Sequence, residues 1–166
     1  AKIPRILDMD KIYGLMLESL LSRDYHQKNQ GNLNYYYNPA RDIFEPIGFD
    51  MTTKELQETF EVFDNRLKNR ILQHEPFRRE FEARARAYTE NQKNLKDDLA
   101  YYDQVVASIE KDIIADTAKL PPTSTFYSET AFYRSTIISN FNKIHEWLEK
   151  GELPITFAEE KYPLTK

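Results

Sequence analysis

The 166-residue chain contains no cysteine. Disulfide bonds, zinc–thiolate sites and cysteine nucleophiles are therefore excluded. The same absence predicts an intracellular, reducing compartment, either the cytoplasm or an organelle interior such as the mitochondrial matrix. Glycine is also scarce, with four residues. Because tight β-turns favour residues that tolerate positive φ, so few glycines predict a fold with little β-structure.

Other classes of protein are disfavoured by what the chain lacks. No apolar run approaches the ~20 residues that span a bilayer, although peripheral membrane association stays open. No glycine-rich phosphate loop is present. The net charge is −4 and the pI is about 5.5. Nucleic-acid-binding proteins usually carry a basic excess, so nucleic acid is an unlikely partner.

Helical periodicity begins near the N-terminus. Residues 8–24 carry apolar side chains at helical spacing (Met9, Ile12, Tyr13, Met16, Leu17, Leu20 and Leu21). Asp8 or Asp10 can cap the first turn. The pattern predicts a short amphipathic helix, which either packs on the rest of the protein or docks into a groove of a partner.

The strongest pattern follows Pro76. Two series of mainly apolar residues, each spaced by seven and offset by four, run through this region: Phe81, Tyr88, Leu95, Tyr102 and Ile109 in one, and Ala85, Gln92, Leu99, Val106 and Ile113 in the other. Heptad spacing over about five repeats is typical of a coiled-coil seam. We therefore expect this face of the helix to contact another helix.

The same spacing continues backwards across the proline, through Phe60, Leu67, His74 and Phe81. Because the helical phase is kept, the sequence predicts one long helix over residues 54–118, kinked at Pro76. Thr52 and Glu55 have the spacing of a capping box at its start. The alternative is a break into a helical hairpin, with Pro76 at the first position of the second helix.

The remaining segments complete an all-α prediction for a single elongated domain, residues 1–166. Residues 119–127 are expected to form a linker, and residues 128–150 a C-terminal helix with its apolar face at Ile137, Phe141, Ile144 and Leu148. Gly151 is expected to end this helix as a left-handed cap. The tail, 151–166, is expected to be extended.

Residues 25–51 show no regular period and predict an extended, aromatic-rich arm. Within it lies the stretch NYYYNPARDIF, which begins at Asn34. Disordered segments are poor in aromatic residues, whereas tyrosine is enriched at interfaces. We therefore expect this segment to lie on a neighbouring surface and to bind a partner through Tyr35, Tyr36, Tyr37, Ile43 and Phe44.

No pattern of catalytic or metal-binding residues emerges. The chain contains neither a GxSxG nor a HExxH motif. His145 and Glu149 could share one helix face, but the Glu-x-x-His pairs of di-iron bundles are absent. We predict no enzyme activity, no cofactor, and no catalytic, cofactor-binding or metal residues.

Charge along the predicted long helix divides into two halves. Residues 66–86 contain seven Lys or Arg and three acids, which gives +4, whereas residues 90–116 contain seven acids and three Lys, which gives −4. Two halves of opposite net charge favour an antiparallel helical partner, either another subunit or a second copy of this chain.

Three functional hypotheses follow from these patterns. The leading one is a non-catalytic scaffolding subunit of a multiprotein assembly, such as an organellar or membrane-associated complex. The second is an adaptor that homodimerises through an antiparallel coiled coil, and the third is a module that contacts RNA or lipid through Arg66–Arg86. Under the first two, the partner-binding seam consists of Phe81, Tyr88, Leu95, Leu99, Tyr102, Val106, Ile109 and Ile113.

Overall fold

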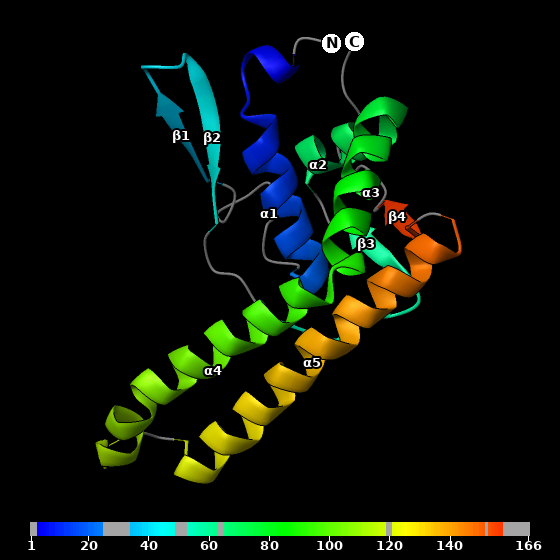
Figure 1. Cartoon of the computed structure of the whole chain (residues 1–166). Helices are drawn as coiled ribbons and strands as arrows, with labels where there is room; N and C mark the ends of the chain where they lie inside the picture. The colour runs from blue at the N-terminus through cyan, green and yellow to red at the C-terminus, as the bar shows by residue number, and fades with distance from the viewer. Residues whose placement is uncertain are drawn as a thin grey trace.

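A computed structural model describes residues 3–24, 34–48, 53–62, 65–118, 121–151 and 153–157. Helices dominate the architecture (Figure 1). In chain order they are a 3₁₀ turn, Ile3–Arg5, and the α-helices α1 (Met9–Ser22), α2 (Arg66–Gln73), α3 (Glu75–Glu90), α4 (Gln92–Ala115) and α5 (Thr123–Glu149).

The all-α prediction is wrong, because the structure also contains β-sheet. Strands β1 (Asn34–Asn38) and β2 (Ile43–Ile47) form an antiparallel hairpin, and β3 (Phe60–Val62) pairs in parallel with β4 (Ile155–Phe157). The fold is therefore mixed, with small sheets beside the helices.

The hairpin forms without glycine in its turn. Asp42 supplies the positive φ, 52°, that glycine usually provides. The side chain of Asn38 accepts a hydrogen bond from the main-chain N–H of Ala40 at 3.1 Å, which is a local turn contact typical of asparagine. Residues 34–48, expected to be an irregular arm, thus form a sheet, while 25–33 and 49–51 lie outside the described residues.

The predicted single helix over 54–118 is also wrong. Residues 53–59 are irregular and lead into β3, and the helical region is broken at His74 and again at Asn91. Pro76 is the second residue of α3, one position later than the alternative prediction placed it. A proline in the first turn lacks only an N–H that would be unpaired anyway. Thr52 lies outside the described residues.

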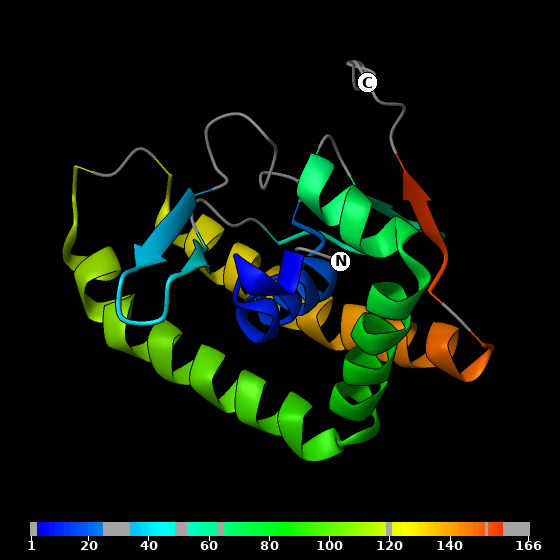
Figure 2. The same ribbon diagram turned by 90° about the horizontal axis from the view of Figure 1, so that it is seen from above.

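The second break was not predicted. Asn91 has an extended conformation, and its side chain accepts a hydrogen bond from the N–H of Lys93 at 3.1 Å. Asparagine is among the best N-cap residues, since its oxygen pairs with a main-chain donor of the first turn. The corner at Asn91 directs α4 away from α3 (Figure 2).

The terminal helices are closer to the predictions. Asp8 caps α1 by accepting from the N–H of Lys11 at 3.2 Å, as expected. Helix α5 begins at Thr123 rather than at residue 128, so half of the predicted linker is helical. Gly151 follows its end with a φ of 131°, which favours glycine. Beyond β4, the tail lies outside the described residues.

The hydrophobic core lies at one end of the molecule, where α1, α2, α3 and the C-terminal half of α5 meet. Phe81, Ile71, Leu20 and Ile144 are completely buried there, and the rings of Tyr13 and Phe81 stack with their centroids 6.5 Å apart. Helix α4 and the first half of α5 project away from this core (Figure 1). None of the described helices has the length and apolarity needed to cross a membrane.

A buried amide connects the core to the irregular segment before β3. Asn140 on α5 is fully buried. Its oxygen accepts from the N–H of Leu56, and its nitrogen donates to the carbonyls of Leu21 and Lys54, all at 2.7 Å. The Asn140 side chain thus provides hydrogen-bond partners for three main-chain groups that have none within a helix or strand.

Candidate functional site

The projecting helices form an arm, defined as α4 with the part of α5 from Thr123 to Ser135. Tyr102 on α4 donates from its hydroxyl to the carbonyl of Thr130 at 2.8 Å, and Arg134 on α5 donates to both oxygens of Asp103 at 2.9 and 3.1 Å. The Arg134 guanidinium holds the pKa of Asp103 below its usual value. These contacts fix the two helices side by side.

The structure places the predicted seam of α4 in different environments. Leu95 is buried, Leu99, Tyr102, Val106 and Ile113 are half-buried, and Ile109 is 43% exposed. Since α4 packs on α5, much of the heptad face contacts another helix of the same chain.

The two predicted seam residues of α3 differ in burial. Phe81 is fully buried in the core and therefore has no surface for a partner. Tyr88 is half-buried, and its hydroxyl lies 2.9 and 2.8 Å from the two carboxylate oxygens of Asp98. Burial and this hydrogen bond raise the pKa of the tyrosine. Tyr88 thereby joins the end of α3 to the start of α4.

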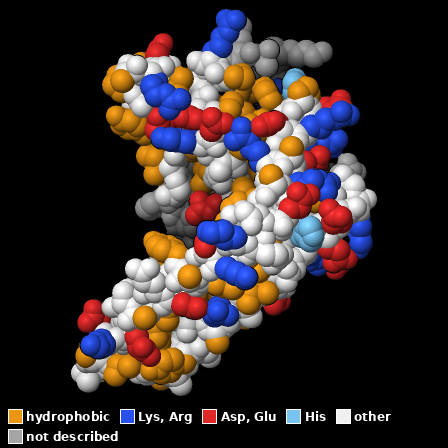
Figure 3. Space-filling model, in the orientation of Figure 1, with side chains coloured by type: hydrophobic (Ala, Val, Ile, Leu, Met, Phe, Trp, Pro, Cys, Tyr) orange, Lys and Arg blue, Asp and Glu red, His pale blue; other side chains and the backbone are white. Residues whose placement is uncertain are grey.

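Large apolar side chains remain exposed along the arm. Tyr101, Val105 and Ile109 are spaced by four on α4 and are 70%, 40% and 43% exposed. Such spacing places them along one side of the helix; we call these three residues the α4 stripe. Further exposed side chains are Ile114, Tyr127 and Phe132, and Figure 3 shows patches of hydrophobic atoms among polar and charged ones at the lower end of the arm.

The arm lacks a core of its own. No described residue between Leu95 and Thr136 is fully buried. Two helices side by side can cover only one face of each other, and soluble monomers rarely leave adjoining apolar side chains uncovered. The α4 stripe is therefore the clearest candidate for a contact with another molecule.

A groove adjoins this stripe near the core. Two cavities of about 450 and 400 Å³ share Gly14, Leu17 and Tyr88 as lining residues. Their α4 walls are Asp98 and Asn94, which lie three and seven residues before Tyr101. At that spacing they share one side of the helix with the stripe, so the groove and the stripe lie on the same side of α4, with the polar side chains of Asp98 and Asn94 on the groove side.

The aromatic residues of the hairpin are divided between the core and the surface. Tyr35 is half-buried against the core, and burial raises its pKa to about 12. Tyr36 is 53% exposed, Tyr37 45% and Phe44 43%, while Ile43 is half-buried. The rings of Tyr37 and Phe44 pair across the strands with their centroids 5.2 Å apart.

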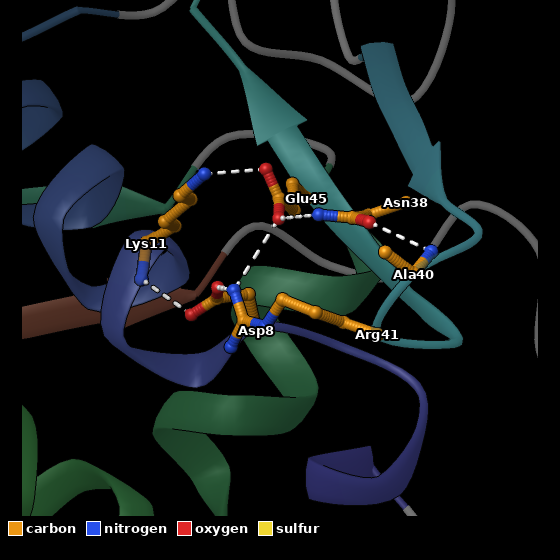
Figure 4. Close-up of polar contacts among 6 residues, drawn as sticks. All are labelled: Asp8, Lys11, Asn38, Ala40, Arg41 and Glu45. Carbon is orange, nitrogen blue, oxygen red and sulfur yellow. Dashed lines mark hydrogen bonds and ion pairs between the residues drawn. The ribbon is translucent and has the colours of Figure 1, made fainter.

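Ion pairs fasten this hairpin to α1 (Figure 4). Arg41 in the turn donates to the buried carboxylate of Asp8 at 2.6 Å. Burial acts to raise the pKa of Asp8, but hydrogen bonds from Arg41 and from the Lys11 N–H outweigh it and lower the pKa overall. The N-cap of α1 and the turn therefore stabilise each other.

Glu45 on β2 provides a second anchor. It pairs with the ammonium of Lys11 and accepts from the side-chain amide of Asn38 at 2.9 Å. The Lys11 hydrogen bond is the main cause of the lowered pKa of this carboxyl. The exposed aromatic side chains are thus held on a fixed support rather than on a loose loop.

One buried pair has the composition of a catalytic dyad. The ammonium of Lys68 donates to the hydroxyl of Ser19 at 2.8 Å, and burial lowers the pKa of the lysine to about 8. However, Ser19 is 1% exposed and donates its own proton to the carbonyl of Leu15 at 2.8 Å. A substrate could not reach this oxygen, so the pair is better explained as a buried structural contact.

Metal ligands are not gathered in the part of the chain that the structure describes. No group of three or more His, Cys, Asp or Glu there could hold an ion. Of the pair weighed from the sequence, His145 and Glu149, the glutamate accepts a hydrogen bond from Arg86 at 3.1 Å.

The heptad template missed Tyr101, Val105 and Ile114. The sequence does contain a signal for them, because each adjoins a seam residue, as Tyr101-Tyr102, Val105-Val106 and Ile113-Ile114. A doubled apolar residue makes the apolar face of a helix wider than one seam requires.

Comparison with known proteins does not assign this arrangement to a family. No family model matches the chain, and neither the curated proteins nor the solved structures include a significant match.

Proposed function

We propose that the chain is a non-catalytic structural subunit of a larger multiprotein assembly and that it binds a neighbouring subunit through the α4 stripe and the adjoining groove. The observation that carries this proposal is the exposed apolar side of an arm without a core. Protein–protein contacts remove such side chains from water. The exposed aromatic side chains of the hairpin offer a further contact surface.

The antiparallel coiled-coil dimer is less well supported. That hypothesis required the basic and acidic halves to lie along one rod, whereas the breaks at His74 and Asn91 distribute them over α2, α3 and α4. Much of the α4 seam also contacts α5. Little of the seam is left for an identical helix.

Binding of RNA or lipid by Arg66–Arg86 is also less well supported. Lys68 is buried. Carboxylates of the same chain pair with four of the arginines, as Arg78–Glu82, Arg79–Glu75, Arg84–Glu80 and Arg86–Glu149. Paired guanidinium groups contribute less to phosphate binding than free ones. The reducing compartment stays a prediction from composition.

The first test is the native mass of the endogenous protein after gentle extraction, followed by antibody detection. Migration with a particle far larger than the 19.7 kDa chain is expected. Migration as a monomer or dimer would contradict the proposal.

The second test replaces the three residues of the α4 stripe by serine. The variant should keep its helical circular dichroism and leave the particle, because these side chains are exposed and lie outside the core. Gln104→Ala with Lys111→Ala is the control, since both are exposed polar residues on the same helix. A triple variant that stays in the particle as the control does would exclude the stripe as the contact.

A further inference from the structure

The outer edge of β1 carries hydrogen-bonding groups that point away from the hairpin. On β2, the N–H of Phe44 donates to the carbonyl of Ile6 at 2.8 Å, and the carbonyl of Phe44 accepts from Asp8 at 2.9 Å. The main-chain groups of Phe44 therefore point away from β1. In an antiparallel ladder, the residue opposite such a position also points outward. Tyr37 pairs with Phe44, and Tyr35 follows by alternation, so both present N–H and C=O at the free edge.

No described element covers this edge. Figures 1 and 2 show β1 on the outside of the hairpin, and no hydrogen bond to another described residue is made by the main chain of Tyr35 or Tyr37. Proteins usually protect an edge strand with lysine, proline or a bulge. The strand NYYYN has neither charge nor proline, so it is suited to pairing with another strand.

The sequence of β1 indicates which strand would pair with its free edge. NYYYN reads the same in both directions, so an antiparallel copy matches it residue for residue. We propose that β1 pairs with β1 of a second copy of this chain about a two-fold axis at Tyr36. Tyr35 then lies opposite Tyr37 of the second copy, and the outward groups of these two residues are the ones that a hydrogen-bonded antiparallel pair requires.

The same pairing closes the assembly at two copies. The far edge of β2 is occupied by the bridge from Leu7 to Phe44, and Pro46 on that edge has no N–H to donate. The hairpin of each molecule thus has one free edge, that of β1, and an isologous two-fold contact pairs the two β1 edges with each other. The strand is short, so the dimer should be weak and dependent on concentration.

Disulfide trapping tests the axis directly. The chain has no cysteine, so Tyr36→Cys introduces a single thiol. At a non-hydrogen-bonded antiparallel pair the Cα atoms are ~4.5 Å apart, within the range that a disulfide bridges. Under mild oxidation, Tyr36→Cys should form a covalent dimer at least about tenfold faster than Gln104→Cys, an exposed control on the arm outside the α4 stripe, because pairing raises the effective thiol concentration. Equal rates would overturn the proposal.

Two further variants test the register. Asn34 lies opposite Asn38 of the second copy, so Asn34→Cys and Asn38→Cys should each link slowly alone and rapidly when mixed. Rapid linking of Asn34→Cys with itself would overturn the two-fold at Tyr36.

Sedimentation of the chain without introduced thiols is an independent measurement. The wild type should show a dimer that grows with concentration. Tyr36→Lys should lower that dimer fraction, because like charges would meet at the axis, while Glu45 opposite it in the hairpin suits a lysine. A wild type that stays monomeric at every concentration would refute the pairing. The experiments use the purified chain alone, so their outcome is independent of the proposed larger assembly.

Discussion

Replacing Asn140 by aspartate tests how the irregular segment before β3 is held. The substitution keeps the shape of the side chain but replaces its NH₂ group by oxygen. The carbonyls of Leu21 and Lys54, which accept from this nitrogen at 2.7 Å, would lose their donor and face a negative charge. The acceptor for the N–H of Leu56 would remain.

The expected cost is large. Leaving a buried polar group without a partner costs about 1–3 kcal/mol, so two carbonyls together cost roughly 2–6 kcal/mol. That is a substantial part of the ~5–15 kcal/mol that stabilises a typical domain. Burial and the facing carbonyls should also raise the pKa of the introduced carboxyl above its unfolded value of ~3.9.

The pH dependence has a definite sign. Above the unfolded pKa, the folded variant binds more protons than the unfolded chain, so its stability falls as pH rises towards the folded pKa. At lower pH the protonated carboxyl can donate to one carbonyl, and the destabilisation relative to wild type should shrink.

Urea unfolding followed by circular dichroism, at acidic and neutral pH, measures both effects. Asn142→Asp is the matched control, because Asn142 is exposed on the same helix. Surface substitutions usually change stability by no more than about 0.5 kcal/mol. If the free energies of unfolding of Asn140→Asp and of this control differ by less than about 0.5 kcal/mol at neutral pH, the reasoning is refuted.

Three other substitutions test separate parts of the structure. Gly14→Ala should raise the free energy of unfolding by about 0.5–1 kcal/mol, because the glycine lies within α1 and nothing lies within 4 Å of an added Cβ; an unchanged or lower urea midpoint would contradict this. Burial lowers the folded pKa of Lys68 from 10.5 to about 8. Because the unfolded chain then binds more protons between these values, the free energy of unfolding of the wild type should increase by up to roughly 3 kcal/mol as pH rises from about 8 to 10. Lys68→Met should lack that increase in urea titrations. Tyr102→Phe removes the hydrogen bond to Thr130 and should cost about 1 kcal/mol; hydrogen exchange in the arm should accelerate, whereas unchanged rates would show that the bond does not hold the arm.

The sequence predicts individual helices better than their connection. Helix α1 and its Asp8 cap follow from local spacing and N-cap chemistry. The heptad series does mark a largely covered face of α4. However, such spacing shows only which face of a helix is apolar and not which helix covers it. The break at Asn91 leaves the apolar phase intact, so periodicity could not reveal it. The local signal was the asparagine itself, a strong N-cap.

The hairpin could not be predicted from alternation, because its two faces do not divide cleanly into buried and exposed. Tyr35 contacts the core, whereas Tyr36 and Tyr37, on opposite faces, are both largely exposed. Three successive tyrosines therefore fit a strand that is only partly covered. The prediction that this segment binds a partner remains untested. The structure adds the direction in which the main-chain groups of β1 point, which a pattern of side chains cannot reveal.

The two proposed contacts use different parts of the molecule and make a joint prediction about stoichiometry. In Figure 1 the hairpin and the end of the arm lie at opposite ends, so pairing through β1 leaves both arms accessible. If both contacts operate, the assembly contains two copies of the chain, which native mass spectrometry of the purified particle would count. Tyr36→Lys should reduce the count to one without releasing the chain, whereas serine at Tyr101, Val105 and Ile109 should release it. A wild-type particle that contains a single copy would show that self-pairing is not used within the assembly.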